Sequence, residues 1–109
     1  MSAATAGLGP EVDAARVIAD LRELETRTSG PDGARRVCWT PEWAQARELL
    51  DELLDEIGLS YELDEAGNAW ARLPGADERP ASLALGSHLD SVPDGGWLDG
   101  PLGVMAAVG

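Results

Sequence analysis

The order of hydrophobic periodicities constrains this fold more than any other feature of the sequence. From Pro10 to about Arg27, apolar residues recur at helical spacing, and Pro10 suits a first helical turn because its missing N–H costs nothing there. A second helix is predicted to begin after Thr40 as its N-cap and to end at Gly58. Both segments are amphipathic, so each is expected to bury one face.

The pattern changes from helical to strand-like after the second predicted helix. Residues 59–63 and 69–73 flank a polar turn at 64–68, and two paired strands are the simplest interpretation. Residues 82–86 are small, apolar and uncharged, which is typical of a strand covered on both faces. Residues 104–108 resemble the first turns of a buried helix that stops without a cap, so the chain is expected to end inside an element. The predicted class is α/β.

Length and charge exclude several classes of function. A chain of 109 residues has room for one small domain at most. Its 20 acidic and 8 basic residues give a formal net charge of −12, which repels phosphate backbones and anionic lipid surfaces. We therefore expect neither a nucleic acid nor a membrane as partner.

Cysteine usage and the beginning of the chain predict the compartment. Cys38 is the only cysteine, so an internal disulfide is excluded. The first ten residues lack the basic start and apolar run of a secretory signal, and we expect residues 1–9 to be flexible. No apolar stretch approaches the roughly 20 residues that cross a bilayer. A soluble protein in the reducing cytoplasm is expected.

One face of the second predicted helix is strongly acidic. It could be a cation site, but clustered carboxylates alone supply no defined coordination geometry, and we favour a solvated surface. The residues concerned are Glu48, Asp51, Glu52, Asp55 and Glu56.

The strongest candidates for chemistry follow the apolar run at 82–86. His88 is the only histidine, and Asp90 lies two positions on, so both side chains leave one face if the strand persists. A metal-bound imidazole usually donates its second N–H to a carboxylate or carbonyl, and Asp90 is a candidate for that group. Open α/β sheets place ligand sites where strands end in loops, as here.

Two further carboxylates lie in the glycine-rich loop after His88. Asp99 follows eleven positions later, and the glycines between allow the backbone to return toward the imidazole. A carboxylate can bridge two cations roughly 3.5–4 Å apart. Asp94 is the weaker candidate, because it lies in the most exposed part of the turn.

The segment GSHLDSVPDGGWLDGPLGV resembles the metal-binding segment of the hydantoinase/carbamoylase-type amidohydrolases, a branch of the dinuclear zinc hydrolases. The resemblance extends through RRVCWTPEWAQARELL and DEAGNAWARLPG to cover roughly residues 12–109. It implies that His88 ligates one metal, that Asp99 bridges two and that Asp90 orients His88 as part of the catalytic machinery. By the same resemblance the cofactors are two divalent ions, zinc or otherwise manganese, cobalt or nickel.

The resemblance also implies a fold and a reaction. Residues 10–109 would be the N-terminal, incomplete part of an aminopeptidase/carboxypeptidase-like zinc-hydrolase catalytic domain. The small-molecule substrate would be an N-carbamoyl-L-amino acid cleaved at its ureido C–N bond. Allantoate amidohydrolase and β-ureidopropionase are the alternative activities. The full-length protein would be a homodimer. This chain supplies only the first ligands, and the family's paired glutamates and further histidines would follow Gly109, so we expect the 109 residues alone to be inactive.

Two other functions compete with this interpretation. The chain could be a truncated, non-catalytic remnant or a small acidic interaction module, in which case it should unfold cooperatively as a soluble monomer. Cys38 could be a nucleophile with His88 as its base, but nothing nearby in the sequence stabilises a thiolate, and a buried structural thiol is favoured.

Overall fold

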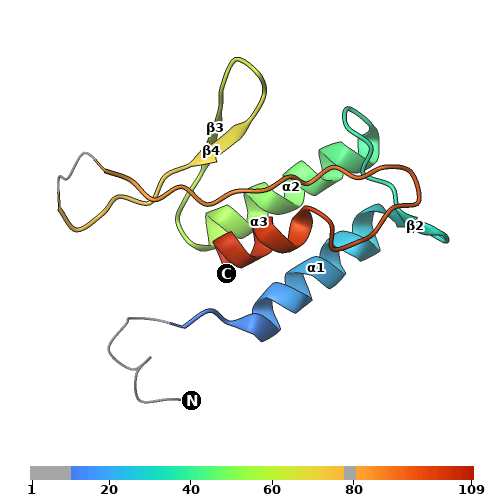
Figure 1. Ribbon diagram of the computed structural model, residues 1–109, viewed down its shortest axis with the longest axis horizontal. Helices are drawn as coiled ribbons and strands as arrows, with labels where there is room; N and C mark the ends of the chain where they lie inside the picture. The colour runs from blue at the N-terminus through green and yellow to red at the C-terminus, as the bar shows by residue number, and fades with distance from the viewer. Residues whose placement is uncertain (1–10, 78–80) are drawn as a thin grey trace.

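Helix α1 packs against both α2 and α3 in the computed structural model, which describes residues 11–77 and 81–109 (Figure 1). Two short antiparallel hairpins, β1–β2 and β3–β4, accompany the three helices of the described ranges. The elements are α1 (Ala14–Thr28), β1 (Ser29–Gly30), β2 (Gly33–Ala34), α2 (Pro41–Glu56), β3 (Tyr61–Leu63), β4 (Ala69–Ala71) and α3 (Pro101–Val108).

The core lies where the three helices meet. Aliphatic side chains at helical spacing on α1 and α2 face each other, and α3 and the segment before it each add one residue to the hydrophobic cluster. Burying such a side chain contributes about 1.5–3 kcal/mol to stability. The members are Val17, Leu21, Leu24, Ala46, Leu49, Leu50, Leu53, Leu54, Leu89 and Met105.

The helix boundaries confirm one prediction and correct another. Helix α2 begins as predicted, because the Thr40 hydroxyl accepts a hydrogen bond from the Trp43 backbone N–H at 3.4 Å and proline occupies the first turn. Helix α1 begins at Ala14 rather than at Pro10, because the Asp13 carboxylate accepts from the Arg16 N–H at 3.1 Å and caps the helix there. Pro10 and the predicted flexible residues 1–9 lie outside the described ranges.

The acidic face of α2 is the solvated surface that the sequence favours. All five of its carboxylates belong to exposed residues, and two of them form ion pairs with α1. Arg27 Nη1 and Nη2 donate to the Glu52 carboxylate at 3.0 and 2.9 Å, and Arg16 Nη2 donates to Glu56 at 2.7 Å. Exposed pairs of this kind contribute about 0–1 kcal/mol each, so they add little to the hydrophobic core.

The predicted pair of strands forms, and its turn is closed by one side chain. Strands β3 and β4 pair antiparallel with Glu62 opposite Trp70. The Asp64 carboxylate accepts from the backbone N–H groups of Ala66 and Asn68, both at 2.9 Å, and from the Trp70 indole N–H at 2.9 Å. The hairpin projects away from the helices (Figure 1).

Acid is expected to loosen this hairpin. The hydrogen bonds from Trp70 and Asn68 lower the pKa of Asp64 from its ordinary 3.8 to about 2. Because the pKa is lower in the folded hairpin, the ionised Asp64 carboxylate stabilises the fold. This stabilisation is fully present above about pH 4 and is lost as the pH falls through about 2. The indole proton shift of Trp70, followed by NMR from pH 5 to 1.5, should therefore move toward that of an exposed tryptophan.

The matched variants separate this effect from general acid unfolding. Asp64→Asn should show the altered Trp70 shift already at neutral pH, whereas Glu65→Gln at the exposed hairpin tip should behave as wild type. A Trp70 shift that stays constant down to pH 1.5 in the wild-type chain would contradict the prediction.

The predicted buried strand at 82–86 is wrong for the described chain. These residues follow an extended path in Figure 1 but form no strand, and Leu83 and Leu85 are 86% and 68% exposed. A strand is covered on both faces only when neighbouring strands and helical layers enclose it. No described segment pairs with its backbone. None of the helices in the described ranges combines the length and the hydropathy needed to span a bilayer.

Candidate functional site

A buried leucine places the two candidate residues that flank it. Leu89 is 7% exposed and belongs to the hydrophobic core. Successive side chains of an extended segment point to opposite sides, so His88 and Asp90 face away from the core. Their side chains are 53% and 46% exposed. The strand expected before this segment is missing, but the alternation predicted for the pair is present.

The imidazole of His88 lies in contact with Asp90. The His88 Nδ1 lies 3.1 Å from the backbone oxygen of Asp90 and 3.2 Å from its carboxylate Oδ1. Both neighbours are acceptors, so the proton belongs on Nδ1 and the lone pair on Nε2. This tautomer is the one in which an imidazole can ligate a cation through Nε2.

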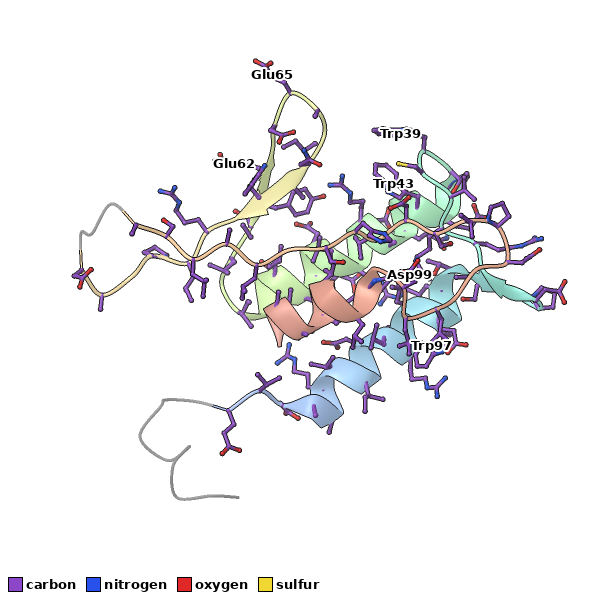
Figure 2. All side chains as sticks on the ribbon, in the orientation of Figure 1. Trp39, Trp43, Glu62, Glu65, Trp97 and Asp99 are labelled. Carbon is purple, nitrogen blue, oxygen red and sulfur yellow. The ribbon has the colours of Figure 1, made fainter. Side chains whose placement is uncertain are left out.

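Gly100, the residue that follows Asp99, lies against His88. A Cβ added at Gly100 would overlap with the His88 ring and with the His88 carbonyl oxygen, so the backbones touch. Gly103, one turn later in α3, makes a similar close approach to Ser87. Figure 2 shows Asp99 at the beginning of α3, whereas Trp97 lies beside α1, where its ring lies 4.1 Å from the Arg22 guanidinium carbon.

Residues 34–36 hold the opposite side of the loop. Ala34 and Gly95 form an antiparallel bridge, with N···O distances of 2.9 and 3.2 Å in its two hydrogen bonds. The Ser91 N–H donates to the Arg36 oxygen at 2.9 Å, and the Arg36 N–H donates to the Ser91 hydroxyl at 3.0 Å. We call residues 34–36 the strap. The sequence does not predict this pairing, since two-residue strands leave no periodic signal.

Asp94, the weaker candidate, is engaged elsewhere. Its carboxylate accepts from Arg35 Nε at 3.1 Å on the outer side of the loop. A Cβ at Gly33, whose φ is +147°, would stand 2.8 Å from the Asp94 carbonyl carbon and the Gly95 oxygen. Glycine is therefore needed where the strap meets the loop.

The chain is similar in sequence to several amidohydrolases. No protein-family model matches the chain. The N-carbamoyl-L-amino-acid amidohydrolase of Paenarthrobacter aurescens is 38% identical over 98 residues, which are 90% of this chain and 24% of that protein. The allantoate amidohydrolase of Escherichia coli is 36% identical over 75 residues, 69% of this chain and 18% of that protein.

A solved structure decides the family. The crystal structure of a hydantoinase/carbamoylase family amidase from Burkholderia ambifaria matches with a TM-score of 0.84 and 35% identity, covering 90% of this chain. The chain belongs to the hydantoinase/carbamoylase family of amidases. It spans about a quarter of the length of these relatives, 24% of both the Paenarthrobacter protein and the Burkholderia structure.

The residue types of the candidate ligands suit a divalent cation, but they are too few to complete its coordination. An imidazole nitrogen and carboxylate oxygens are ligands that zinc prefers, and a zinc site takes about four donors. His88 and Asp99 would supply two of these. In the described part of the chain, no group of three or more histidine, cysteine, aspartate or glutamate side chains is arranged to hold a metal ion.

The cysteine alternative gains no support from the geometry. Cys38 is a free, half-buried thiol rather than the buried structural thiol favoured by the sequence. The Nδ1 of His88 is directed to Asp90, and within the described residues no hydrogen bond joins the imidazole to Cys38. A nucleophile and its base must lie within hydrogen-bonding reach.

Proposed function

We propose that the protein to which this chain belongs is a metal-dependent amidohydrolase that cleaves the ureido C–N bond of an N-carbamoyl-L-amino acid. The observation that carries the proposal is the contact of His88 Nδ1 with Asp90, together with the close approach of Gly100, the residue after Asp99, to the His88 ring. Relatives whose names specify this reaction are 38% and 40% identical over 98 and 89 residues. Their names support an amidohydrolase.

Each residue has a distinct part in the proposal. His88 would ligate one divalent ion through Nε2, Asp99 would bridge two ions through its carboxylate, and Asp90 would keep the His88 ring in the required tautomer. Zinc suits this donor set, and manganese, cobalt or nickel are alternatives. A bound cation supplies positive charge that polarises the scissile carbonyl and acidifies a water molecule.

Other ureido substrates compete with N-carbamoyl-L-amino acids. Two relatives with 36% and 35% identity are named allantoate amidohydrolase, and another with 31% identity is named ureidoglycolate hydrolase. A β-ureidopropionase activity is a further alternative of the same chemical class. We also propose a cytoplasmic homodimer as the working form. The 109 residues alone are expected to be inactive, because two ligands cannot complete a two-metal site.

A chimeric enzyme tests the proposal. The matching 89-residue segment of the Geobacillus stearothermophilus N-carbamoyl-L-amino acid amidohydrolase would be replaced by the corresponding part of this chain. With zinc or manganese added, we expect the chimera to release amino acid from an N-carbamoyl-L-amino acid. A second chimera in the Escherichia coli allantoate amidohydrolase, assayed with allantoate, compares the substrate classes.

The unmodified recipient enzymes are the controls for metal loading and assay. A chimera that unfolds cooperatively but turns over none of the ureido substrates would overturn the proposed function. Activity in the allantoate recipient alone would shift the proposal to that substrate class.

A further inference from the structure

Arg36 makes an unusual set of contacts beneath the His88–Asp90 pair. Its side chain is 0% exposed. The guanidinium Nε donates to the backbone oxygen of Leu89 at 2.7 Å, and the Arg36 backbone exchanges two hydrogen bonds with Ser91. Arg36 is therefore hydrogen-bonded to the residues immediately before and after Asp90, which are Leu89 and Ser91.

Stability alone does not account for a buried guanidinium at this place. Arg36 Nη1 and Nη2 are both buried and have no hydrogen-bond partner in the described part of the chain. Burial lowers the pKa of Arg36, and the nearby Asp90 carboxylate opposes this shift only in part. An apolar side chain of similar size would avoid the desolvation of the charge. What the apolar side chain could not do is donate to the Leu89 carbonyl.

The Leu89 carbonyl belongs to the peptide group that joins Leu89 to Asp90. Fixing that peptide plane fixes the backbone on which His88 and Asp90 leave the same side. The hydrogen bond from Nε and the two bonds to Ser91 limit rotation of this segment from three points. A rotation there would separate His88 Nδ1 from the Asp90 oxygens.

We propose that Arg36 is a positioning residue that sets the orientation of the His88–Asp90 pair through the Leu89 carbonyl and Ser91. The orientation itself is a property of the metal-free chain, whereas its consequence for metal binding rests on the proposed function. The buried Arg36 side chain holds the Leu89 oxygen with one hydrogen bond, and the Arg36 backbone holds Ser91 with two more.

The test compares two neighbouring arginines in the full chain. Arg36→Met removes the Nε donor while keeping a long side chain, and Arg35→Met removes the same charge from an exposed residue whose partner is Asp94. Because the chain has a single histidine, its imidazole gives one Hε1 resonance in NMR. In metal-free Arg36→Met we expect that resonance to move toward an exposed imidazole and the Ser91 amide to exchange at least about tenfold faster.

Zinc binding gives the second readout. Loss of a residue that orients a ligand typically weakens metal affinity by about 10–100-fold, and we expect that loss in Arg36→Met titrated with zinc. Arg35→Met should match wild type in all three measurements. Arg36→Lys should recover part of the effect, because an ammonium can also donate to the Leu89 oxygen.

A folding defect can be recognised and bypassed. Far-UV circular dichroism shows whether Arg36→Met folds, and Ser91→Ala offers a milder variant that removes only the hydroxyl partner. Ser91→Ala should shift the His88 resonance in the same direction by a smaller amount. A folded Arg36→Met with a wild-type His88 resonance and wild-type Ser91 exchange would overturn the proposal.

The metal readout separates the two proposals. If the NMR changes occur but His88→Ala binds zinc as well as wild type does, the metal site at His88 fails while the positioning role of Arg36 stands.

Discussion

Replacing His88 by alanine is expected to reduce turnover by the carbamoylase chimera by at least about a thousandfold. Charge stabilisation by a bound cation contributes several kcal/mol to the transition state, and each 1.4 kcal/mol is a factor of ten in rate. The same substitution should remove the zinc affinity that depends on Nε2. Steady-state kinetics and zinc titration of the chimera measure both effects.

Two carboxylates of the same loop provide a matched comparison. Asp99→Asn should lose activity like His88→Ala, because a neutral amide cannot bridge two cations. Asp94→Asn should keep most of it, since that carboxylate is bonded to Arg35 outside the proposed site. Equal losses from the two substitutions would argue that loop charge rather than ligation matters, and no loss from either would contradict the assignment of Asp99.

Gly100→Ala is expected to destabilise the chain by about 2–6 kcal/mol. Gly100 has φ +96° and ψ −64°, a conformation that L side chains rarely adopt and that costs about 1–3 kcal/mol. The new Cβ would also overlap with the His88 ring and carbonyl, and overpacking adds about 1–3 kcal/mol. Total stabilities of 5–15 kcal/mol make this a large share.

Two other glycines distinguish the cost of the backbone conformation from the cost of overlap with His88. Gly58 has φ +76° with nothing within 4 Å of an added Cβ, so Gly58→Ala should show the backbone cost alone. Gly96 has only Asp99 Cβ nearby, at 4.0 Å, so Gly96→Ala should change stability little. Urea unfolding of the three variants gives the comparison. Equal destabilisation by Gly58→Ala and Gly100→Ala would show that contact with His88 contributes nothing.

Helix α2 and the β3–β4 hairpin illustrate what local sequence can predict. Thr40 followed by proline caps a helix with side-chain and backbone groups that are close in the chain. Asp64 closes its turn with donors two to six residues away. These features depend on neighbours in sequence, so the helix start and the position of the turn could be predicted from the chain.

The segment at 82–86 and Arg36 illustrate what local sequence cannot predict. An apolar run becomes a buried strand only if other strands pair with it, and no described segment does so. Arg36 is one of two adjacent arginines between the two predicted helices, and its hydrogen-bond partners Leu89 and Ser91 lie more than 50 residues away. Contacts at such separations leave no periodic signal.

The sequence by itself determined the helical stripes, the turn at Asp64 and the choice of His88, Asp90 and Asp99 as candidates, because residue type and spacing carry the chemistry of helices, turns and ligands. The tertiary structure alone decided how the candidates are oriented. Leu89 enters the core, α3 approaches through Gly100, and the strap bonds the loop from the other side. Orientation depends on packing between distant segments, and only the folded chain brings those segments together.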